Sequence, residues 1–228
     1  MMELSLVRVL NAFAFACNVV VNSLPAKYEI GELSAKYQTL VTPAAFAFSI
    51  WVLIFMAELA FVLAFVLAQF FTTGSVFVDA IGYNFVFANI AQSLWVVAFT
   101  WYQATFAAMF CMLCILFFLI QIARQQIVLS TNASVSFLDW VLFQFPFTIH
   151  CGWISVATLV SLNILLVHTN ATFQFMIAMG CLVVVLIAGG LMLLANPPLY
   201  TIAVVYCWAT VRILVNKFRL RFFILNNL

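Results

Sequence analysis

Two ionisable side chains stand inside long apolar stretches, where a charged group is costly and is therefore a candidate for function. Glu58 lies in the run Phe-Met-Ala-Glu-Leu-Ala, and His150 lies in Phe-Thr-Ile-His-Cys. A carboxyl group and an imidazole within reach of each other can share a proton or hold a polar group of a ligand. The alternative is a structural role, in which protonated Glu58 is hydrogen-bonded to a neighbouring Ser, Asn, Trp or backbone carbonyl.

The depths of these two residues agree. Counted along helices from residue 70 and residue 139, Glu58 lies about 18 Å and His150 about 16 Å from the same membrane face. We therefore expect the two side chains to meet if their helices are neighbours.

The other reactive residues give weaker signals. Cys111 and Cys114 form a CxxC, but no second CxxC and no nearby His accompany it, so we interpret the six cysteines as packing residues. Asn132 and Asn170 begin glycosylation sequons, to which we assign no role because the motif is short. A Ser-His-Asp set, paired catalytic carboxylates and nucleotide-binding fingerprints are missing from the sequence, so we do not expect an enzyme. We also expect no metal site.

The composition indicates the environment in which the chain folds. Of the 228 residues, 68% are hydrophobic and only 6% are charged, against about 25% charged in an average soluble domain. With a mean hydropathy of +1.25, the chain is predicted to be an integral membrane protein in a lipid bilayer. This excludes a soluble enzyme and a nucleic-acid partner.

The apolar runs are continuous, which favours membrane helices over the alternating strands of a barrel. A spanning helix needs about 20 residues. We predict an all-α protein with about seven spans, near residues 5–23, 42–70, 81–101, 104–123, 139–168, 172–195 and 199–216. Thr42 and Pro43 suit the start of the second span, and Pro146 predicts a kink or late start in the fifth. Segments 24–41, 71–80 and 124–138 are read as polar connections.

The positions of Lys and Arg predict the orientation. With seven spans, segment 24–41 and the C-terminal tail share one side, which carries Lys27, Lys36, Arg212, Lys217, Arg219 and Arg221. The other side carries Arg8 and Arg124. We therefore expect the first side to face the negative compartment.

Aromatic and amide side chains also lie within the predicted spans. Trp51, Trp95 and Trp153 each carry an indole N–H that needs a partner, and Asn89 and Asn163 are polar groups in apolar runs. Such a cluster would suit a flat hydrophobic ligand. Ordinary helix packing is the alternative.

Three stretches carry a resemblance to a known family. Residues 42–55 contain Pro43, Phe46, Phe48, Trp51 and Phe55, which resemble the start of the second helix of the TspO/MBR family, the tryptophan-rich sensory or translocator proteins. Asn89 with the Leu-Trp run 94–101, and the Pro, Trp, Ala and Leu-Asn pattern of 146–163, resemble its third- and fifth-helix motifs. The spacings differ from those of the short bacterial members, and the match is closest to the longer, divergent branch of that family.

The resemblance implies a five-helix TspO-like bundle over 1–168, with 169–228 as an extension of two helices and a basic tail. In that fold helices two and five are neighbours and the first long loop covers one end. Members of that family bind porphyrins, sterols and drug-like aromatics, so the resemblance implies a ligand of this type. By that analogy the ligand-binding residues would be Trp51, Phe55, Asn89, Trp95 and Trp153, in a pocket that opens toward segment 24–41.

The sequence is compatible with two main functions. One is binding of a hydrophobic aromatic, sterol or porphyrin-like molecule, with bound lipid, pigment or porphyrin as the expected cofactor class. The other is a non-catalytic accessory subunit of a large respiratory or photosynthetic membrane complex, with other membrane-protein subunits as partners. An inner membrane of a mitochondrion or plastid is one expected location. An energised transporter ranks third, because no repeat symmetry is visible.

Overall fold

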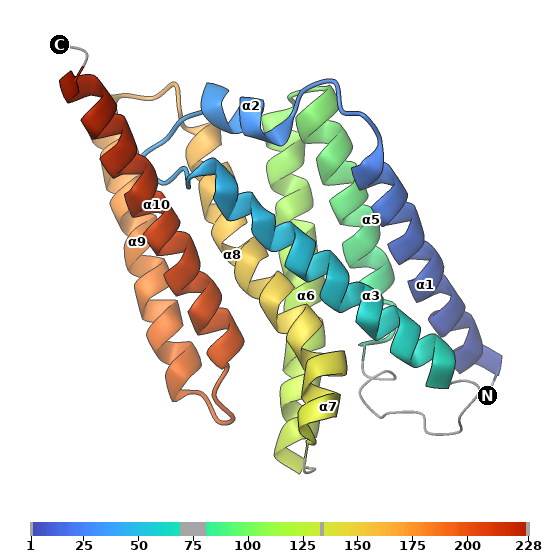
Figure 1. Cartoon of the computed structure of the whole chain (residues 1–228). Coiled ribbons are helices and arrows are strands. Elements are labelled where there is room, and N and C mark those ends of the chain that lie inside the picture. The colour runs from blue at the N-terminus through green and yellow to red at the C-terminus, as the bar shows by residue number, and fades with distance from the viewer. Residues whose placement is uncertain (1, 69–80, 133–134, 227–228) are drawn as a thin grey trace.

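The computed structural model describes residues 2–68, 81–132 and 135–226, and it describes side chains over 6–64, 81–131 and 135–217 (Figure 1). All the regular secondary structure in these ranges is helical, as the apolar runs predict. The elements are α1 (Met2–Ser23), α2 (Ile30–Lys36), η1 (Ala45–Ser49), α3 (Ile50–Ala68), α5 (Asn84–Val96), η2 (Val97–Trp101), α6 (Thr105–Asn132), α7 (Phe137–Asp139), η3 (Trp140–Gln144), α8 (Phe145–Leu165), α9 (Ala171–Leu194) and α10 (Tyr200–Asn226). The predicted connection 71–80 lies outside the described residues.

The long helices form a bundle with a helical hairpin beside it (Figure 1). Within the bundle, α5 packs on α1 and α6, and α8 packs on α3 and α6. The hairpin of α9 and α10 joins the bundle mainly through contacts between α10 and α8. The short helix α2 crosses one end, and the two termini lie at opposite ends of the molecule (Figure 1). We call the end that α2 covers the lid end.

The described residues contain five helical segments long and apolar enough to cross a membrane, which makes the protein a multi-pass integral membrane protein. They are Leu6–Ser23, Ala45–Ala64, Thr105–Thr131, Phe137–Leu165 and Ala171–Leu194. Helices α5 and α10 lie alongside them (Figure 1) but are not among these five. The count of seven spans therefore stays a prediction.

Two local expectations were wrong. Thr42 caps no helix: its Oγ1 accepts a hydrogen bond from the backbone N–H of Thr39 at 2.8 Å, and the η1 turn begins after Ala44. Residues 124–132 are not a loop but the last turns of α6. Arg and Gln are good helix formers, so the helix continues past its apolar part.

The region around Pro146 is irregular, as its sequence predicts. The π-helical turn η3 comes directly before α8, and Pro146 occupies the first turn of α8, where its missing N–H costs nothing. The wider turn of η3 changes the helical phase upstream of the proline. Residues Phe137 to Leu165 thereby form one helical stretch with an interruption near one end.

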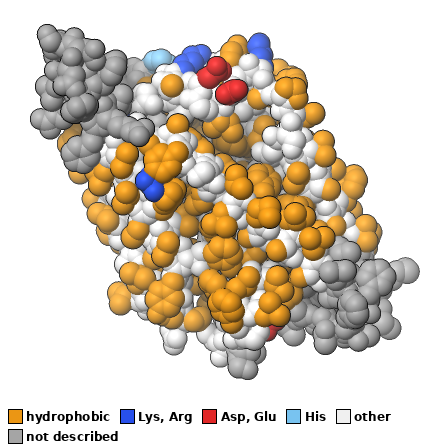
Figure 2. Space-filling view, viewed as in Figure 1, with side chains coloured by type: hydrophobic (Ala, Val, Ile, Leu, Met, Phe, Trp, Pro, Cys, Tyr) orange, Lys and Arg blue, Asp and Glu red, His pale blue; other side chains and the backbone are white. Residues whose placement is uncertain are grey.

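The hairpin approaches α8 most closely at a glycine. A Cβ atom added to Gly152 would lie 3.1 Å from the Val205 Cβ and 3.3 Å from the Ile202 Cα. A side chain there would meet the α10 backbone, so glycine permits this helix contact. Figure 2 shows hydrophobic side chains over most of the visible face, while most of the visible charged side chains gather near the lid end.

Candidate functional site

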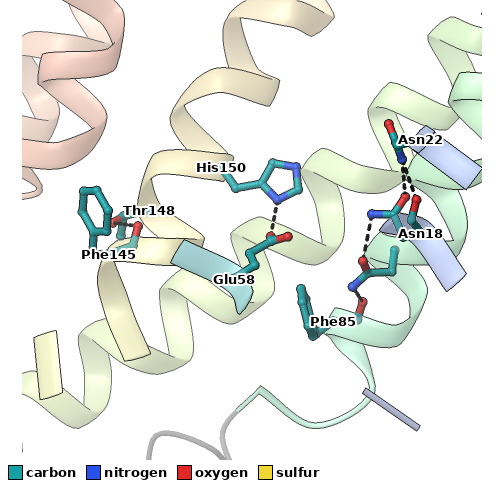
Figure 3. Close-up of polar contacts among 8 residues, drawn as sticks. Asn18, Asn22, Glu58, Phe85, Phe145, Thr148 and His150 are labelled. Carbon is teal, nitrogen blue, oxygen red and sulfur yellow. Dashed lines mark hydrogen bonds and ion pairs between the residues drawn. The ribbon is translucent and has the colours of Figure 1, made fainter. Parts of the chain in front are cut away.

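Glu58 on α3 and His150 on α8 meet in the interior of the bundle. The His150 Nδ1 and Glu58 Oε1 are 2.7 Å apart, and both side chains are buried, at 1% and 0% exposed (Figure 3). Within the described part of the chain, Glu58 Oε2 and His150 Nε2 have no hydrogen-bond partner. The pair thus holds one shared hydrogen bond and has two free positions for a proton or a polar group.

Trp51 connects this pair to a cluster of aromatic rings. Its ring centroid lies 5.6 Å from that of His150 in an edge-on arrangement. It also lies 6.2 Å from Trp95, 6.5 Å from Trp153 and 6.0 Å from Phe55. These separations fall in the range of favourable ring contacts. A shift of the His150 ring would therefore be felt by Trp51 and, through it, by Trp95 and Trp153.

A second polar cluster joins α1 to α5. The Asn18 Nδ2 donates to the Asn89 Oδ1 at 2.9 Å, and the Asn89 Nδ2 donates to the Phe85 carbonyl at 2.8 Å (Figure 3). Asn22 donates to Asn18, and the Ser93 hydroxyl reaches the Asn18 Oδ1. Interhelical amide bonds of this kind hold apolar helices in register. Asn89 is therefore engaged with α1.

A cavity lies beneath α2, and we call it the lid cavity. Its walls include Ile30 and Tyr37 from the α2 segment, Phe48 from η1, Trp95 and Phe99 from the α5 side, and Trp153 from α8. Its volume is about 50 Å³. The Trp153 indole is 2% exposed, and its N–H has no acceptor among the described residues. This N–H is a donor at the wall of an otherwise mainly aromatic and aliphatic cavity.

We call residues 24–44, the stretch between α1 and η1 that contains α2, the lid segment, and it is fastened on two sides. On one side, the Lys36 ammonium and the Tyr37 hydroxyl both donate to the Gln103 Oε1. Gln103 follows the π-helical turn η2 and has φ +51°, a conformation that costs a non-glycine residue strain. Irregular helical turns of the π type occur often at functional sites.

On the other side the lid segment is tied to α10. The Asn216 amide donates to the Thr42 carbonyl at 2.9 Å, and the Lys217 ammonium donates to the Thr39 carbonyl. Lys217 lies beyond the predicted end of the last span, and its burial lowers the pKa of its ammonium group. These bonds bring the C-terminal part of α10 to the lid segment.

The predicted site residues divide between these places. Trp95 and Trp153 line the lid cavity, whereas Trp51 and Phe55 lie in the ring cluster next to it. Among the described residues, no group of three or more His, Cys, Asp or Glu side chains could hold a metal ion. Phe48 and Phe99 were not among the predicted ligand-binding residues, and the bond between Asn18 and Asn89 was not predicted. The spacing of Asn11, Asn18 and Asn22 by seven and four residues was a usable signal, because it places all three on one helix face.

The fold and site define a class: a helical, multi-pass membrane protein with an aromatic cavity under a fastened lid. More specifically, the chain belongs to the TSPO-like protein family, whose family model matches residues 5–225. The match therefore extends through α9 and over most of α10 as well as the five preceding long helices. No curated protein and no solved structure matches the chain.

Proposed function

We propose that this protein binds a flat hydrophobic molecule of the aromatic, sterol or porphyrin-like type in the lid cavity, without catalysing a reaction. The observation that carries the proposal is the unpartnered indole N–H of Trp153 within the described residues. Trp95 and Phe99 offer ring faces to a flat ligand, and the N–H can orient one acceptor atom of it. Membership of the TSPO-like family supports this type of ligand.

The cavity volume implies that the lid must move for binding. About 50 Å³ holds a water-sized group, whereas small-molecule sites measure about 300–1,000 Å³. Ile30 and Tyr37 of the lid segment form part of the wall. We infer that the ligand displaces this segment and breaks its bonds to Gln103.

The test is a binding titration of the full chain in lipid nanodiscs, with protoporphyrin IX and cholesterol as separate probes. Trp153→Phe removes the indole N–H and keeps an aromatic ring. We expect about three- to tenfold weaker binding, the loss of one hydrogen bond. Trp101→Phe is the matched control, because Trp101 is exposed and outside the lid cavity. If neither probe binds saturably, or if both variants bind alike, the proposal fails.

We propose that Glu58 and His150 position Trp51 behind the cavity. The hydrogen bond fixes the His150 ring, and that ring packs edge-on to Trp51. Glu58→Gln and His150→Phe should each weaken binding of the same probe. If neither substitution alters folding or ligand binding, the pair has no such role.

The second candidate function is an accessory subunit of a larger membrane assembly, for which an organelle inner membrane is one setting. Helix α9 favours it, because only Ala178, Cys181 and Val185 of this helix are buried. The space beside Gly180 and Gly190 is open, which permits close approach of another helix. Native gel electrophoresis of gently extracted membranes tests it, with mass spectrometry of the bands. Migration only as a monomer would rule it out.

A further inference from the structure

A larger cleft lies at the end of the molecule opposite the lid, between the bundle and the hairpin. Its walls include Gln126 and Ser130 of α6, Trp140 and Gln144 of η3, and Tyr200 and Thr201 at the start of α10. Figure 1 shows α7 and the turn between α9 and α10 at this end, away from α2. The cleft measures about 670 Å³, which falls within the usual range for a small-molecule site. We call it the hairpin cleft.

A buried acceptor stands in its wall. Gln126 is 2% exposed, and its Nε2 donates to the Phe143 carbonyl, which fixes the orientation of the amide. Its Oε1 receives no hydrogen bond from any described residue. Buried carbonyl oxygens are nearly always paired, so a ligand O–H at this point would satisfy a group that the protein leaves open.

Neighbouring polar groups are already held by one another. The Gln144 Nε2 donates to the Ser130 hydroxyl, and that hydroxyl donates to the Gln126 backbone carbonyl. The Thr148 hydroxyl donates to the carbonyl of Gln144. Among the buried side-chain atoms of the described lining residues, the Gln126 Oε1 is the one that lacks a hydrogen-bond partner, and the hydroxyl group of a ligand fits it.

The composition of the cleft wall disfavours lipids with anionic headgroups. The residues that line the hairpin cleft include no Lys, Arg, His, Asp or Glu within the described ranges. The nearest acid in sequence, Asp139, accepts a hydrogen bond at 2.7 Å from Ser136, which lines the cleft. A phosphate would therefore find no Lys, Arg or His side chain among the described lining residues to offset its charge. Trp140 and Tyr200 suit the level of a lipid headgroup.

From these observations we infer that the hairpin cleft binds an uncharged lipid with a free hydroxyl group, of the diacylglycerol or sterol type. The hydroxyl donates to the Gln126 Oε1, and the apolar body lies between α8 and the start of α10. This site is separate from the lid cavity and does not depend on the function proposed for it.

The experiment is native mass spectrometry of the full chain released from nanodiscs that contain dioleoylglycerol, cholesterol or phosphatidic acid. Gln126→Leu removes the acceptor, and Gln125→Leu is the matched control on the exposed side of the same helix. We expect Gln126→Leu to retain the neutral lipid about three- to tenfold less than wild type. Thr201→Trp places a bulky ring in the wall of the cleft, leaves both partners of the bond between Gln126 and Phe143 unchanged, and should strongly reduce retention.

The dioleoylglycerol and cholesterol arms identify which of the two hydroxyl lipids is preferred, and retention of either supports the inference. Equal retention of phosphatidic acid would overturn it. So would retention that is the same in Gln126→Leu and Gln125→Leu, or that survives Thr201→Trp. If Gln126→Leu does not fold, Thr201→Trp decides the matter.

Discussion

The contact between Glu58 and His150 places an acid and an imidazole where neither reaches water. Both are buried, and their bond joins α3 to α8 across 92 positions of sequence. Burial of such a pair is costly unless the two groups satisfy each other. Each residue therefore offsets part of the free-energy cost of burying the other, and the free energy of unfolding should depend on the pair as a unit.

A double-mutant cycle tests this dependence. Glu58→Leu should destabilise the protein by about 3–5 kcal/mol, because it leaves the His150 imidazole buried without its partner. The double variant with His150→Leu should be less destabilised than the sum of the single variants, with a coupling of about 1–3 kcal/mol. Unfolding of all the variants in one detergent measures this coupling. Met56→Leu is a control on the exposed side of α3. Additive effects would show that the two residues act independently.

The sequence alone predicted this contact more securely than it predicted the rest of the candidate site. Glu58 and His150 could be matched because helical rise is constant, so equal counts from one face give equal depths. Rise does not reveal which helix faces meet. For that reason the bond between Asn18 and Asn89 could not be predicted, nor that Trp51 packs behind the lid cavity while Trp153 lines it.

Among the elements, the contact between α8 and α10 depends on Gly152. Gly152→Ala should destabilise the protein by about 1–3 kcal/mol, since the new methyl group would press on the Ile202 backbone. Gly180→Ala is the matched control, because the space beside this residue of α9 is open and alanine favours the helix by about 1 kcal/mol. Thermal unfolding compares the two. Equal stability of both variants would mean that α10 adjusts without cost.

The lid should open more readily when its bond to the α5–α6 turn is removed. Gln103→Gly deletes the acceptor of Lys36 and Tyr37, and glycine adopts the positive φ at this position without strain. Hydrogen exchange of residues 30–37 should become faster, and so should the association of a lid-cavity ligand. Gln125→Gly is the control on the exposed side of α6. Unchanged exchange would show that α10 alone holds the lid.

The ends of the helices were predictable only where the composition of the sequence changes sharply. The break after α9 at Asn196 was placed correctly, because two prolines follow it. The end of α6 was missed, since polar residues such as Arg124 leave the apolar pattern without leaving the helix. Hydropathy reports the solvent around a helix, whereas the end of the helix depends on capping and chain reversal.

For the whole molecule, the few charged residues and the arrangement of the helices both indicate which regions share one side of the membrane. Lys36 lies in the lid, and Lys217 of α10 donates a hydrogen bond to the Thr39 carbonyl of the lid segment. Two regions that the charge pattern assigns to one side of the membrane are thus in direct contact. Arg219 and Arg221 belong to the same predicted side, but their side chains lie outside the described residues. This contact supports the prediction that the two regions share one side of the membrane.

The termini test whether the number of crossings is odd, as seven crossings require, because an odd number places the two termini on opposite sides of the membrane. They lie at opposite ends of the molecule (Figure 1). In sealed vesicles of one orientation, protease should remove an epitope tag from only one terminus, and from both after detergent is added. A cysteine introduced by Ala35→Cys, at an exposed lid position, should react with an impermeant maleimide only on the side of the C-terminal tag. The wild-type chain is the control, since its exposed Cys17 and Cys207 lie within helices predicted to face lipid. Removal of both tags, or of neither, from intact vesicles would require an even number of crossings, and one of α5 and α10 would then not span the membrane.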